Sequence, residues 1–525
     1  MTSVTSRHAA YGIALFLASA CGLALEIAAA RLLAPYLDMS LHIWTAIISV
    51  VVAGFAAGNW IGGRLAGPEV DEIAGRRRMA FLLGTTALTT LVALPLLRSL
   101  GSYASLSTSL LSVFGLTALL FLVPSVFIGT VSPLLAKMAV DVEPPTAGRT
   151  IGRMYALGVA GAILGTVAAG YLLIPVMGAI NTVILLVAVE GILAAGFALA
   201  ARPNRAVAAI LSVLILAVGA WGIAINAFRS TCTVESSYYC ITMMPEHDPG
   251  GRVVMSLFLD RAEHSTNVRD EPAYLYWPYA HFLDEMLTAR DKASPRVFYL
   301  GGGGLTLPRA LLARDPGATI VVAELDPAVS QAAMDHMWVK PDPRMEVIHG
   351  DGRLTLEELP PVPAFDAMVG DAYRNLQVPP HLVTHEFLHA IRVRLKPDGF
   401  FAMNLIDARV KPLLLFSVIK TLQLDFPVVE VWLDEKEPWY ARSVSYLVIA
   451  ANEPTNIDRL EAQRGPDHSW KRFSAEEIEA RMRETNPMIL TDDYTPVERL
   501  RANYCAFRIL ERIGIHLAQP GRCPP

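Results

Sequence analysis

Four consecutive glycines follow an apolar segment in the second half of the chain, in Val297-Phe-Tyr-Leu-Gly301-Gly-Gly-Gly304, and a second apolar run ends at Glu324. Where a buried strand turns into a helix through glycines, backbone N–H groups can approach an anionic or nucleoside ligand. An acidic residue roughly 20 positions later can then bind ribose hydroxyls. We therefore expect the following residues to bind a nucleoside cofactor: Gly301, Gly302, Gly303, Gly304 and Glu324.

Further acidic residues follow the next predicted strands. Asp351 stands between Gly350 and Gly352 after the run 345–349, and Asp371 ends the run 365–371. Because the carboxyl ends of parallel strands meet at one edge of a sheet, these carboxylates should lie near the ligand. Asp351 suits an adenine amino group. Asp371 would face the reacting centre, where a carboxylate can accept a proton from an attacking amine or stabilise a sulfonium cation. For any one of these residues, a helix N-cap is the structural alternative.

Strands and helices alternate around these residues. The predicted strands are 296–301, 319–324, 345–349, 365–371 and 399–405, an order that favours a doubly wound α/β sheet. Two shorter predicted strands, 233–243 and 252–260, are separated by a Pro/Asp/Gly-rich turn. We expect a small β-hairpin subdomain with a connecting helix over residues 229–290, and a Rossmann-like catalytic domain with a C-terminal extension over residues 291–525.

The first 228 residues have a different character. Hydrophobic residues make up 53% of the chain and charged residues 18%, and the apolar excess is concentrated in this half. Seven runs approach the ~20 residues that a helix needs to cross the hydrocarbon core of a bilayer. They are 11–34, 43–66, 79–97, 110–136, 151–176, 180–201 and 206–228. Residues 1–228 are therefore expected to form a multi-pass α-helical domain of about seven helices in a lipid bilayer.

Arginines indicate how this domain is oriented. Three junctions between the predicted spans carry them: Arg64 with Arg76, Arg77 and Arg78; Arg149 with Arg153; and Arg202 with Arg205. Because cytoplasmic loops are enriched in Lys and Arg, seven spans predict a cytoplasmic amino terminus. The soluble domain would then face the periplasm at a bacterial inner membrane, and one span more or fewer would reverse this. Leu17-Ala-Ser-Ala-Cys21 weakly resembles a lipoprotein cleavage site, but the apolar run continues past it, so we expect no cleavage.

The positions of the five cysteines indicate which of them could form disulfides in the soluble region. Cys21 lies in the first apolar run, whereas Cys232, Cys240, Cys505 and Cys523 lie near the two ends of the soluble region. An extended strand over 232–240 would keep its two thiols too far apart to bond to each other. Bridges to the carboxy-terminal pair are therefore expected, with four free thiols as the alternative.

Charged residues within the apolar runs could line a transport path or pack against neighbours. We favour a Glu26–Arg31 packing pair in the first run and a Glu190 that faces neighbouring helices. The net charge of −5 and the lack of a basic stripe give no indication of nucleic-acid binding. The histidines are too scattered to predict a metal site.

Taken together, several motifs resemble those of the spermidine synthases, aminopropyltransferases with a methyltransferase-like Rossmann fold. In the second half these motifs are the glycines 301–304, Glu324-Leu-Asp326-Pro-Ala-Val, Asp342-Pro-Arg344, Gly350–Gly352, Phe365-Asp366 through Asp371, and Leu395-Lys-Pro-Asp-Gly399. The chain also resembles the membrane-fused branch of the family, through Gly22-Leu-Ala-Leu-Glu26 with Arg31, Pro124–Gly129 with Pro133-Leu-Leu, and Leu490–Glu498.

The resemblance implies an S-adenosylmethionine-type co-substrate, attack by an amine on the carbon next to sulfur, and release of methylthioadenosine. It implies ribose binding by Glu324, adenine binding by Asp351, acid/base catalysis by Asp371 and an amine channel lined by Tyr276. We also assign Tyr373 to the catalytic group. Three further residues join the cofactor-binding group: Asp326, Gly352 and Arg374.

Four positions depart from the family pattern. Gly304 replaces the aspartate that receives the amino group of decarboxylated S-adenosylmethionine, and Arg374 replaces the second carboxylate of an Asp-x-x-Asp pair. Trp277 and Pro278 replace a Gln or His followed by Glu. Each change removes negative charge or adds positive charge. Since a guanidinium binds a carboxylate in bidentate fashion, intact S-adenosylmethionine becomes an alternative to the decarboxylated form.

The expected function is aminopropyl transfer to an amine. One alternative is cleavage of S-adenosylmethionine by a lyase or cyclase, or aminocarboxypropyl transfer, again with release of methylthioadenosine. Another is a transporter or sensor whose soluble domain binds the nucleoside without turnover. The expected partners are a small-molecule amine, or none, and the lipid bilayer. A homo-oligomer is compatible with the sequence.

Overall fold

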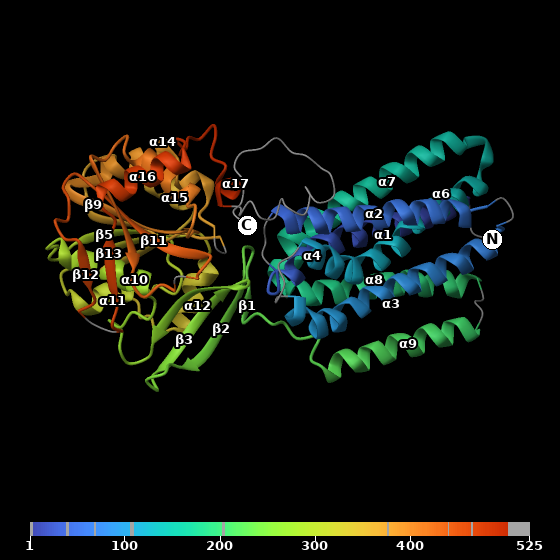
Figure 1. Cartoon of the computed structure of the whole chain (residues 1–525). Coiled ribbons are helices and arrows are strands. Elements are labelled where there is room, and N and C mark those ends of the chain that lie inside the picture. The colour runs from blue at the N-terminus through green and yellow to red at the C-terminus, as the bar shows by residue number, and fades with distance from the viewer. Residues whose placement is uncertain are drawn as a thin grey trace. The chain divides into compact units, whose positions relative to one another are not determined.

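The computed structural model describes residues 4–501 except 38–40, 68–69, 105–109, 202–204, 375–376, 439 and 464–465. The chain divides into two units. The first comprises the residues up to 242 together with 259–261, and the second comprises 243–258 and the residues from 262 onward. The first unit is helical, and the second is built around a nine-stranded sheet (Figure 1).

The helices of the first unit coincide with the predicted apolar runs. They are α1 (Val4–Leu33), α2 (Leu41–Leu65), α3 (Glu72–Ala104), α4 (Leu110–Thr117), α5 (Val123–Gly129), α6 (Val131–Val142), α7 (Ala147–Ala168), α8 (Ile174–Ala201) and α9 (Arg205–Ala224). In the described part of the chain, six helical segments are long and apolar enough to cross a membrane. One of them, Pro144–Ala201, has 58 residues and contains two of the seven predicted runs. The number of crossings therefore stays a prediction.

Gly178 interrupts this long segment. Its backbone has φ +83° and ψ 164°, which is not helical. The helix resumes at Ala179, whose N–H donates to Oε2 of Glu235 at 2.7 Å. A Cβ on Gly178 would lie 3.2 Å from Oε1 of Glu235. A carboxylate at a helix N-terminus stabilises it, so Glu235 both caps the second part of α8 and packs against the glycine that breaks it.

Small residues let α7 pack directly on α1. A Cβ on Gly161 would lie 2.2 Å from the carbonyl oxygen of Phe16, and one on Gly165 would lie 2.1 Å from that of Ala20. Such close backbone approach is typical of helices that associate through small residues.

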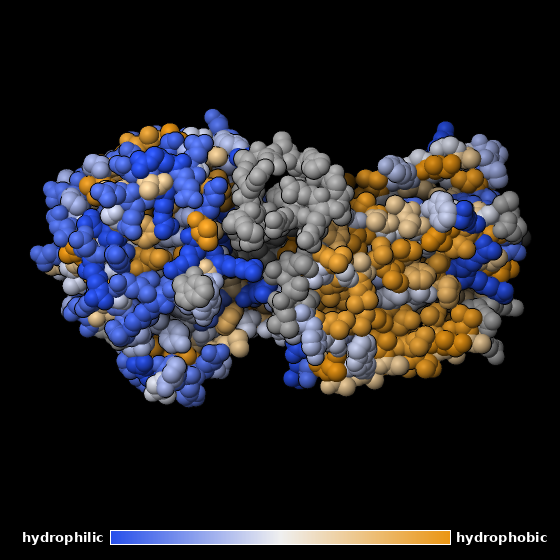
Figure 2. All heavy atoms as spheres, in the orientation of Figure 1, coloured by the Kyte–Doolittle hydropathy of each residue, from blue (hydrophilic) through white to orange (hydrophobic). Residues whose placement is uncertain are grey.

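The outer surface of the helical unit is apolar. Figure 2 shows hydrophobic residues over much of its visible face, whereas the visible face of the second unit is mainly hydrophilic. Leu111, Tyr171 and Leu199 are 83%, 86% and 85% exposed. Glu190, in contrast, is fully buried within the unit.

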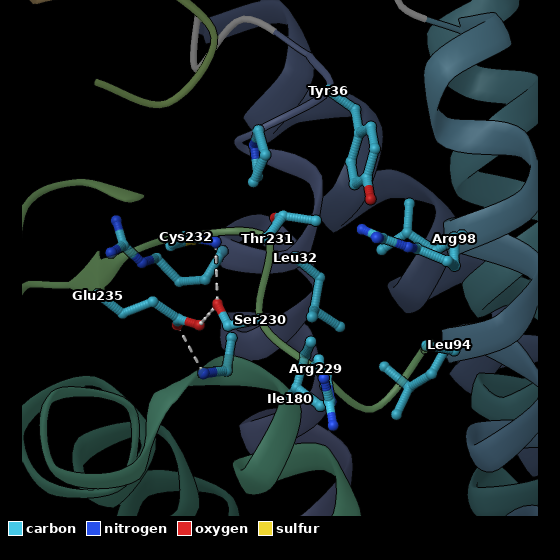
Figure 3. Close-up of a pocket in the computed structure, with 15 residues that line it drawn as sticks. Leu32, Tyr36, Leu94, Arg98, Ile180, Arg229, Ser230, Thr231, Cys232 and Glu235 are labelled. Carbon is cyan, nitrogen blue, oxygen red and sulfur yellow. Dashed lines mark hydrogen bonds between the residues drawn. The ribbon is translucent and has the colours of Figure 1, made fainter. Parts of the chain in front are cut away.

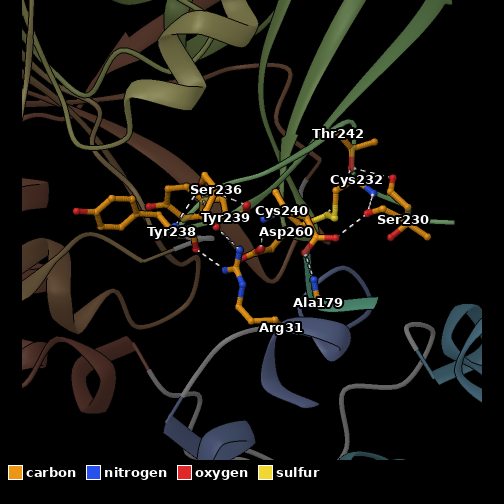
Figure 4. Close-up of a disulfide and its surroundings, with 12 residues drawn as sticks. Arg31, Ala179, Ser230, Cys232, Ser236, Tyr238, Tyr239, Cys240, Thr242 and Asp260 are labelled. Carbon is orange, nitrogen blue, oxygen red and sulfur yellow. Dashed lines mark hydrogen bonds between the residues drawn. A yellow bond between two sulfur atoms is a disulfide. The ribbon is translucent and has the colours of Figure 1, made fainter. Parts of the chain in front are cut away.

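The expected pairing of the cysteines is wrong. Cys232 and Cys240 form a disulfide with each other, and their Cα atoms are 5.2 Å apart. Residues 232–240 are not one extended strand, because a turn at Ser236 reverses the chain. The Ser236 hydroxyl accepts hydrogen bonds from the N–H groups of Tyr238 and Tyr239. As a result, β1 (Val234–Glu235) pairs antiparallel with the first residues of β2 (Cys240–His247) (Figure 4). Cys505 and Cys523 lie outside the described residues.

The expected Glu26–Arg31 pair is also replaced by other contacts. The Arg31 guanidinium donates to the carbonyl oxygens of Ser236 and Tyr238, each at 2.8 Å (Figure 4). Arg31 stands in the last turn of α1, so it fastens the turn that follows β1 to the end of this helix.

The second unit contains the predicted doubly wound sheet. Five strands run parallel: β5 (Arg296–Leu300), β6 (Thr319–Glu324), β7 (Met345–His349), β8 (Phe365–Gly370) and β9 (Leu395–Ala408). Four more extend the sheet beyond β9: β10 (Val428–Asp434), β11 (Ser443–Ala451), β12 (Arg459–Glu461) and β13 (Ser469–Arg472). The full order is β12-β13-β10-β11-β9-β8-β5-β6-β7, and β11 is antiparallel to β9. The predicted strand 399–405 is longer in the structure, because pairing with β11 extends it to Ala408.

Helices connect these strands, and a smaller sheet precedes them. The helices are α10 (Pro278–Ala289), α11 (Thr306–Arg314), α12 (Pro327–His336), α13 (Gly352–Glu358), α14 (His385–Arg394), α15 (Leu413–Leu422), α16 (Ala475–Thr485) and α17 (Val497–Arg501). The small sheet has the order β1-β2-β3-β4, with β3 at Val253–Leu259 and β4 at Ala262–Val268. The strands β5, β6 and β8 are apolar and almost fully buried, as expected for a sheet covered on both faces. The edge strand β7 is only partly buried.

We predict that Gly165→Ala destabilises the helical unit. The new methyl group would overlap the Ala20 backbone, and overpacking typically costs about 1–3 kcal/mol. Gly152→Ala is the control in the same helix, because nothing lies within 4 Å of its Cβ position. Thermal unfolding of the detergent-solubilised protein should show a lower midpoint for Gly165→Ala alone. Equal midpoints for the two variants would refute the close packing of α7 on α1.

Candidate active site

The glycine turn takes backbone conformations that suit glycine. Gly301 has φ +90° and Gly303 has φ +48°. A Cβ on Gly301 would lie 2.7 Å from the carbonyl oxygen of Asp371 and 3.0 Å from the Cα of Ala372. The turn after β5 therefore lies directly against the chain that leaves β8, as predicted for neighbouring parallel strands.

Glu324 holds the turn in place. Its Oε2 accepts hydrogen bonds from the N–H groups of Gly302 at 2.8 Å and Gly303 at 3.0 Å, and its Oε1 accepts one from Asp326 at 3.0 Å. The side chain is buried, and burial raises its pKa while these hydrogen bonds oppose the rise. Each carboxylate oxygen has two lone pairs, so the residue retains acceptor capacity for ribose hydroxyls. Ribose binding stays a prediction.

Two of the predicted binding residues cap helices. Asp326 is the N-cap of α12 and accepts from the N–H of Ala328 at 3.0 Å. Asp351 is the N-cap of α13, and its Oδ1 accepts from the N–H groups of Arg353 and Leu354. Its Oδ2 lies 2.8 Å from Nε2 of His381. The N-cap alternative that was weighed for Asp351 is thus present. It leaves only Oδ2, which already lies beside His381, to accept from an adenine amino group.

Gly352 is the first residue of α13, and a Cβ there would lie 3.0 Å from Leu300. This contact brings the start of α13 against the end of β5. Gly352 therefore keeps Asp351 close to the glycine turn.

Asp371 follows the last residue of β8 and is partly buried. Its Oδ1 accepts a hydrogen bond from Nδ2 of Asn404 at 3.1 Å. Loss of solvent raises the pKa of Asp371 to about 7, although hydrogen bonds from Asn404 and Tyr279 act in the opposite direction. A carboxyl group with this pKa can exchange a proton near neutral pH.

The Tyr373 hydroxyl is hydrogen-bonded to β9, and its predicted catalytic role stays a prediction. Its hydroxyl donates to the carbonyl oxygen of Asn404 at 2.7 Å and accepts from the N–H of Ile406 at 3.1 Å. The single hydroxyl proton is therefore already used to bind β9. This contact fixes the segment that follows Asp371 beside Asn404.

The remaining predicted residues, Arg374 and Tyr276, are exposed and partly buried, respectively. Arg374 is exposed, and its backbone pairs with Gln377. Tyr276 is partly buried and meets the ring of Trp277 edge to face, with centroids 5.6 Å apart. The indole N–H of Trp277 donates to Thr266 at 3.2 Å.

Four residues of the site were not identified from the sequence: Ser265, Asn267, Tyr279 and Asn404. Ser265 and Asn267 alternate along β4, so both side chains point to one face of the strand. Tyr279 lies in the aromatic segment at the start of α10. Asn404 is a lone amide in a buried apolar strand, a pattern that calls for a specific hydrogen-bond partner.

The surroundings of Gly304 explain why no larger residue stands there. Its N–H donates to the Ser265 hydroxyl at 2.9 Å, and its carbonyl accepts from the Asn267 amide at 3.1 Å. A Cβ on Gly304 would lie 2.7 Å from Cε of Met337 and 2.8 Å from Cβ of Ser265. An aspartate at this position therefore does not fit without a shift of β4 or Met337.

The glycine turn, the acidic strand ends and the sheet order define a doubly wound α/β domain whose candidate site lies at the carboxyl ends of the parallel strands. No family model matches the chain. It is similar to a polyamine aminopropyltransferase of Vibrio vulnificus, with 29% identity over 25% of this chain and 44% of that protein. It is also similar to polyamine aminopropyltransferase 2 of Streptomyces coelicolor, with 24% identity over 78% of this chain and 76% of that protein.

Among solved structures, a probable spermidine synthase from Corynebacterium glutamicum is similar, with 17% identity, coverage of 49% of this chain and 95% of that chain, and a TM-score of 0.40. The match to the Vibrio vulnificus relative spans less than half of that protein. The Streptomyces coelicolor match is longer than the second unit, so it also includes part of the helical unit. These sequence matches confirm the resemblance: the chain is spermidine synthase-like.

We predict that Gly304→Ala lowers the stability of the second unit by about 1–3 kcal/mol, because its methyl group overlaps Ser265 and Met337. Gly350→Ala is the control, since its nearest neighbour is the movable Thr355 hydroxyl at 3.2 Å. The midpoint of denaturant unfolding measures the difference. If Gly304→Ala proves as stable as the control, steric closure does not account for glycine at this position.

Proposed function

We propose that this protein is a membrane-anchored enzyme that transfers an aminopropyl-type group from an adenosyl sulfonium substrate to an amine and releases methylthioadenosine. The observation that carries the proposal is Asp371, a carboxyl group with a pKa of about 7 beside the glycine turn. The names of the relatives, polyamine aminopropyltransferases, support this reaction class.

In this reaction, the amine nitrogen attacks the carbon next to sulfur. A carbon–nitrogen bond forms, the carbon–sulfur bond breaks, and its electron pair stays on sulfur, which becomes a neutral thioether. The attacking nitrogen gains a positive charge and must lose a proton. We assign that proton to the Asp371 carboxylate, which Asn404 orients through Oδ1.

The form of the co-substrate is a second question. Decarboxylated S-adenosylmethionine follows from the relatives' names, because aminopropyl transfer uses it. The intact form is favoured by two residues, Gly304, which supplies no carboxylate, and Arg374, which is exposed three positions after Asp371. Neither the relatives nor the site supports lyase chemistry.

We further propose that the helical unit spans a membrane. Its exposed apolar side chains would otherwise face water, which is costly for a surface of this size. The last residues of α2, α6 and α8 and the first residues of α3, α7 and α9 lie at the same end of the unit as the start of α1 (Figure 1). The arginines Arg76, Arg77, Arg149 and Arg153 belong to this end, which supports a cytoplasmic location for it.

The disulfide supports a periplasmic location for the end of the helical unit opposite the amino terminus. Disulfides persist in oxidising compartments such as the bacterial periplasm. Cys232–Cys240 follows α9, so we propose that this end, and the catalytic unit after it, face the periplasm. The co-substrate would then have to be available outside the cytoplasm.

We predict that Asp371→Asn reduces the rate of methylthioadenosine formation by about 10²–10⁴-fold, the usual contribution of a general base, while the nucleoside still binds. In the native enzyme the base is the deprotonated form, so the rate should rise with pH up to about 7 and then level off. Asp366→Asn is the control at the other end of β8, because among the described residues its carboxylate pairs with Lys396 and the N–H of Arg296. A pH-independent rate, or full activity of Asp371→Asn, would exclude Asp371 as the base.

The orientation leads to a labelling prediction. In a variant with Cys505 and Cys523 replaced by serine, Glu479→Cys should react with a membrane-impermeant maleimide in intact spheroplasts, because Glu479 is exposed in the catalytic unit. Arg149→Cys should react only after permeabilisation. The reverse pattern would assign the catalytic unit to the cytoplasm.

A further inference from the structure

A pocket lies within the helical unit, at the end that carries the disulfide. It is lined by the C-terminal parts of α1 and α3, by the residues of α8 that follow Gly178, and by the segment after α9. Its apolar part includes Leu32, Leu94, Leu97 and Ile180. Figure 3 shows the Arg98 side chain extending into this pocket from α3, with Tyr36 nearby.

Three guanidinium groups belong to the same pocket. Arg31 is held by the carbonyl oxygens of Ser236 and Tyr238, so its orientation is fixed. Arg98 and Arg229 are exposed, and within the described residues no carboxylate forms an ion pair with either of them. This leaves positive charge concentrated beside an apolar surface.

Glu235 is the acidic residue in the lining, and its carboxylate is already engaged. Oε2 accepts from the N–H of Ala179 at 2.7 Å, and Oε1 accepts from the Ser230 hydroxyl at 2.8 Å (Figure 3). Through these contacts the negative charge of Glu235 lies at the helix N-terminus that begins at Ala179. The three arginines therefore outnumber the acidic groups of the pocket.

We propose that this pocket binds a phosphate group, with Arg98 and Arg229 as its ligands. Arginine binds phosphate through paired charge-assisted hydrogen bonds. The apolar residues beside the arginines suit the glycerol and the first methylenes of an anionic phospholipid. A free phosphate is the other source of the same chemistry. The proposal does not depend on the reaction of the second unit.

The test uses the full chain in detergent and native mass spectrometry with added phosphatidylglycerol. Arg98→Gln/Arg229→Gln should weaken saturable lipid binding by about tenfold or more, the effect of losing charge-assisted hydrogen bonds. The control, Arg149→Gln/Arg153→Gln, removes the same charge from exposed arginines at the other end and should change the affinity by less than about twofold. Arg98→Lys/Arg229→Lys, which keeps the charge, should give an intermediate loss if the double glutamine variant folds poorly.

Inorganic phosphate distinguishes the two sources. Displacement of the lipid by millimolar phosphate, with the same sensitivity to the Arg98 and Arg229 changes, assigns the site to a free phosphate. Retention of the lipid assigns it to a phospholipid head group. Equal lipid affinity of the pocket variant and its control, or binding that does not saturate in the native protein, overturns the proposal.

Discussion

The Glu324 carboxylate is the contact on which the candidate site depends. By accepting three backbone hydrogen bonds, it ties the turn after β5 to the end of β6 and to the start of α12. A buried carboxylate is costly unless hydrogen bonds compensate for its lost hydration, and the glycine N–H groups provide them. Without Glu324 these N–H groups would be left with no acceptor, and the turn would lose the conformation that brings Gly301 against Asp371.

Asp371 and its neighbours form the second half of this arrangement. Asn404 belongs to β9 and Tyr279 to α10, and both influence the pKa of Asp371. The Tyr373 hydroxyl fixes the segment that follows Asp371 against β9. Removal from solvent raises the pKa of Asp371 to about 7. The same shift means that the folded state holds the proton more tightly than the unfolded chain, so the ionised group costs stability as pH rises from about 4 toward 7. Such a cost at a site is typical of a group kept for chemistry rather than for folding.

The sequence allowed the parallel strands to be predicted mainly because β5, β6 and β8 are short apolar runs that end at, or just before, a glycine or an acidic residue. The glycine turn and the strand-end residues Glu324 and Asp371 were predicted for the same reason. Contacts between segments distant in the chain were not predictable. Asn404 and Tyr279 reach Asp371 only after the sheet and α10 are assembled. The disulfide was mispredicted because a single serine, Ser236, turns the chain between its two cysteines.

The central claim is group transfer from an adenosyl sulfonium compound to an amine. Mass spectrometry of the purified full chain, incubated with decarboxylated or intact S-adenosylmethionine and with or without putrescine, tests it directly. We predict methylthioadenosine together with an aminopropylated or aminocarboxypropylated amine, and neither product without the amine. Methylthioadenosine formed equally well without any amine, or no turnover of either compound, would contradict it.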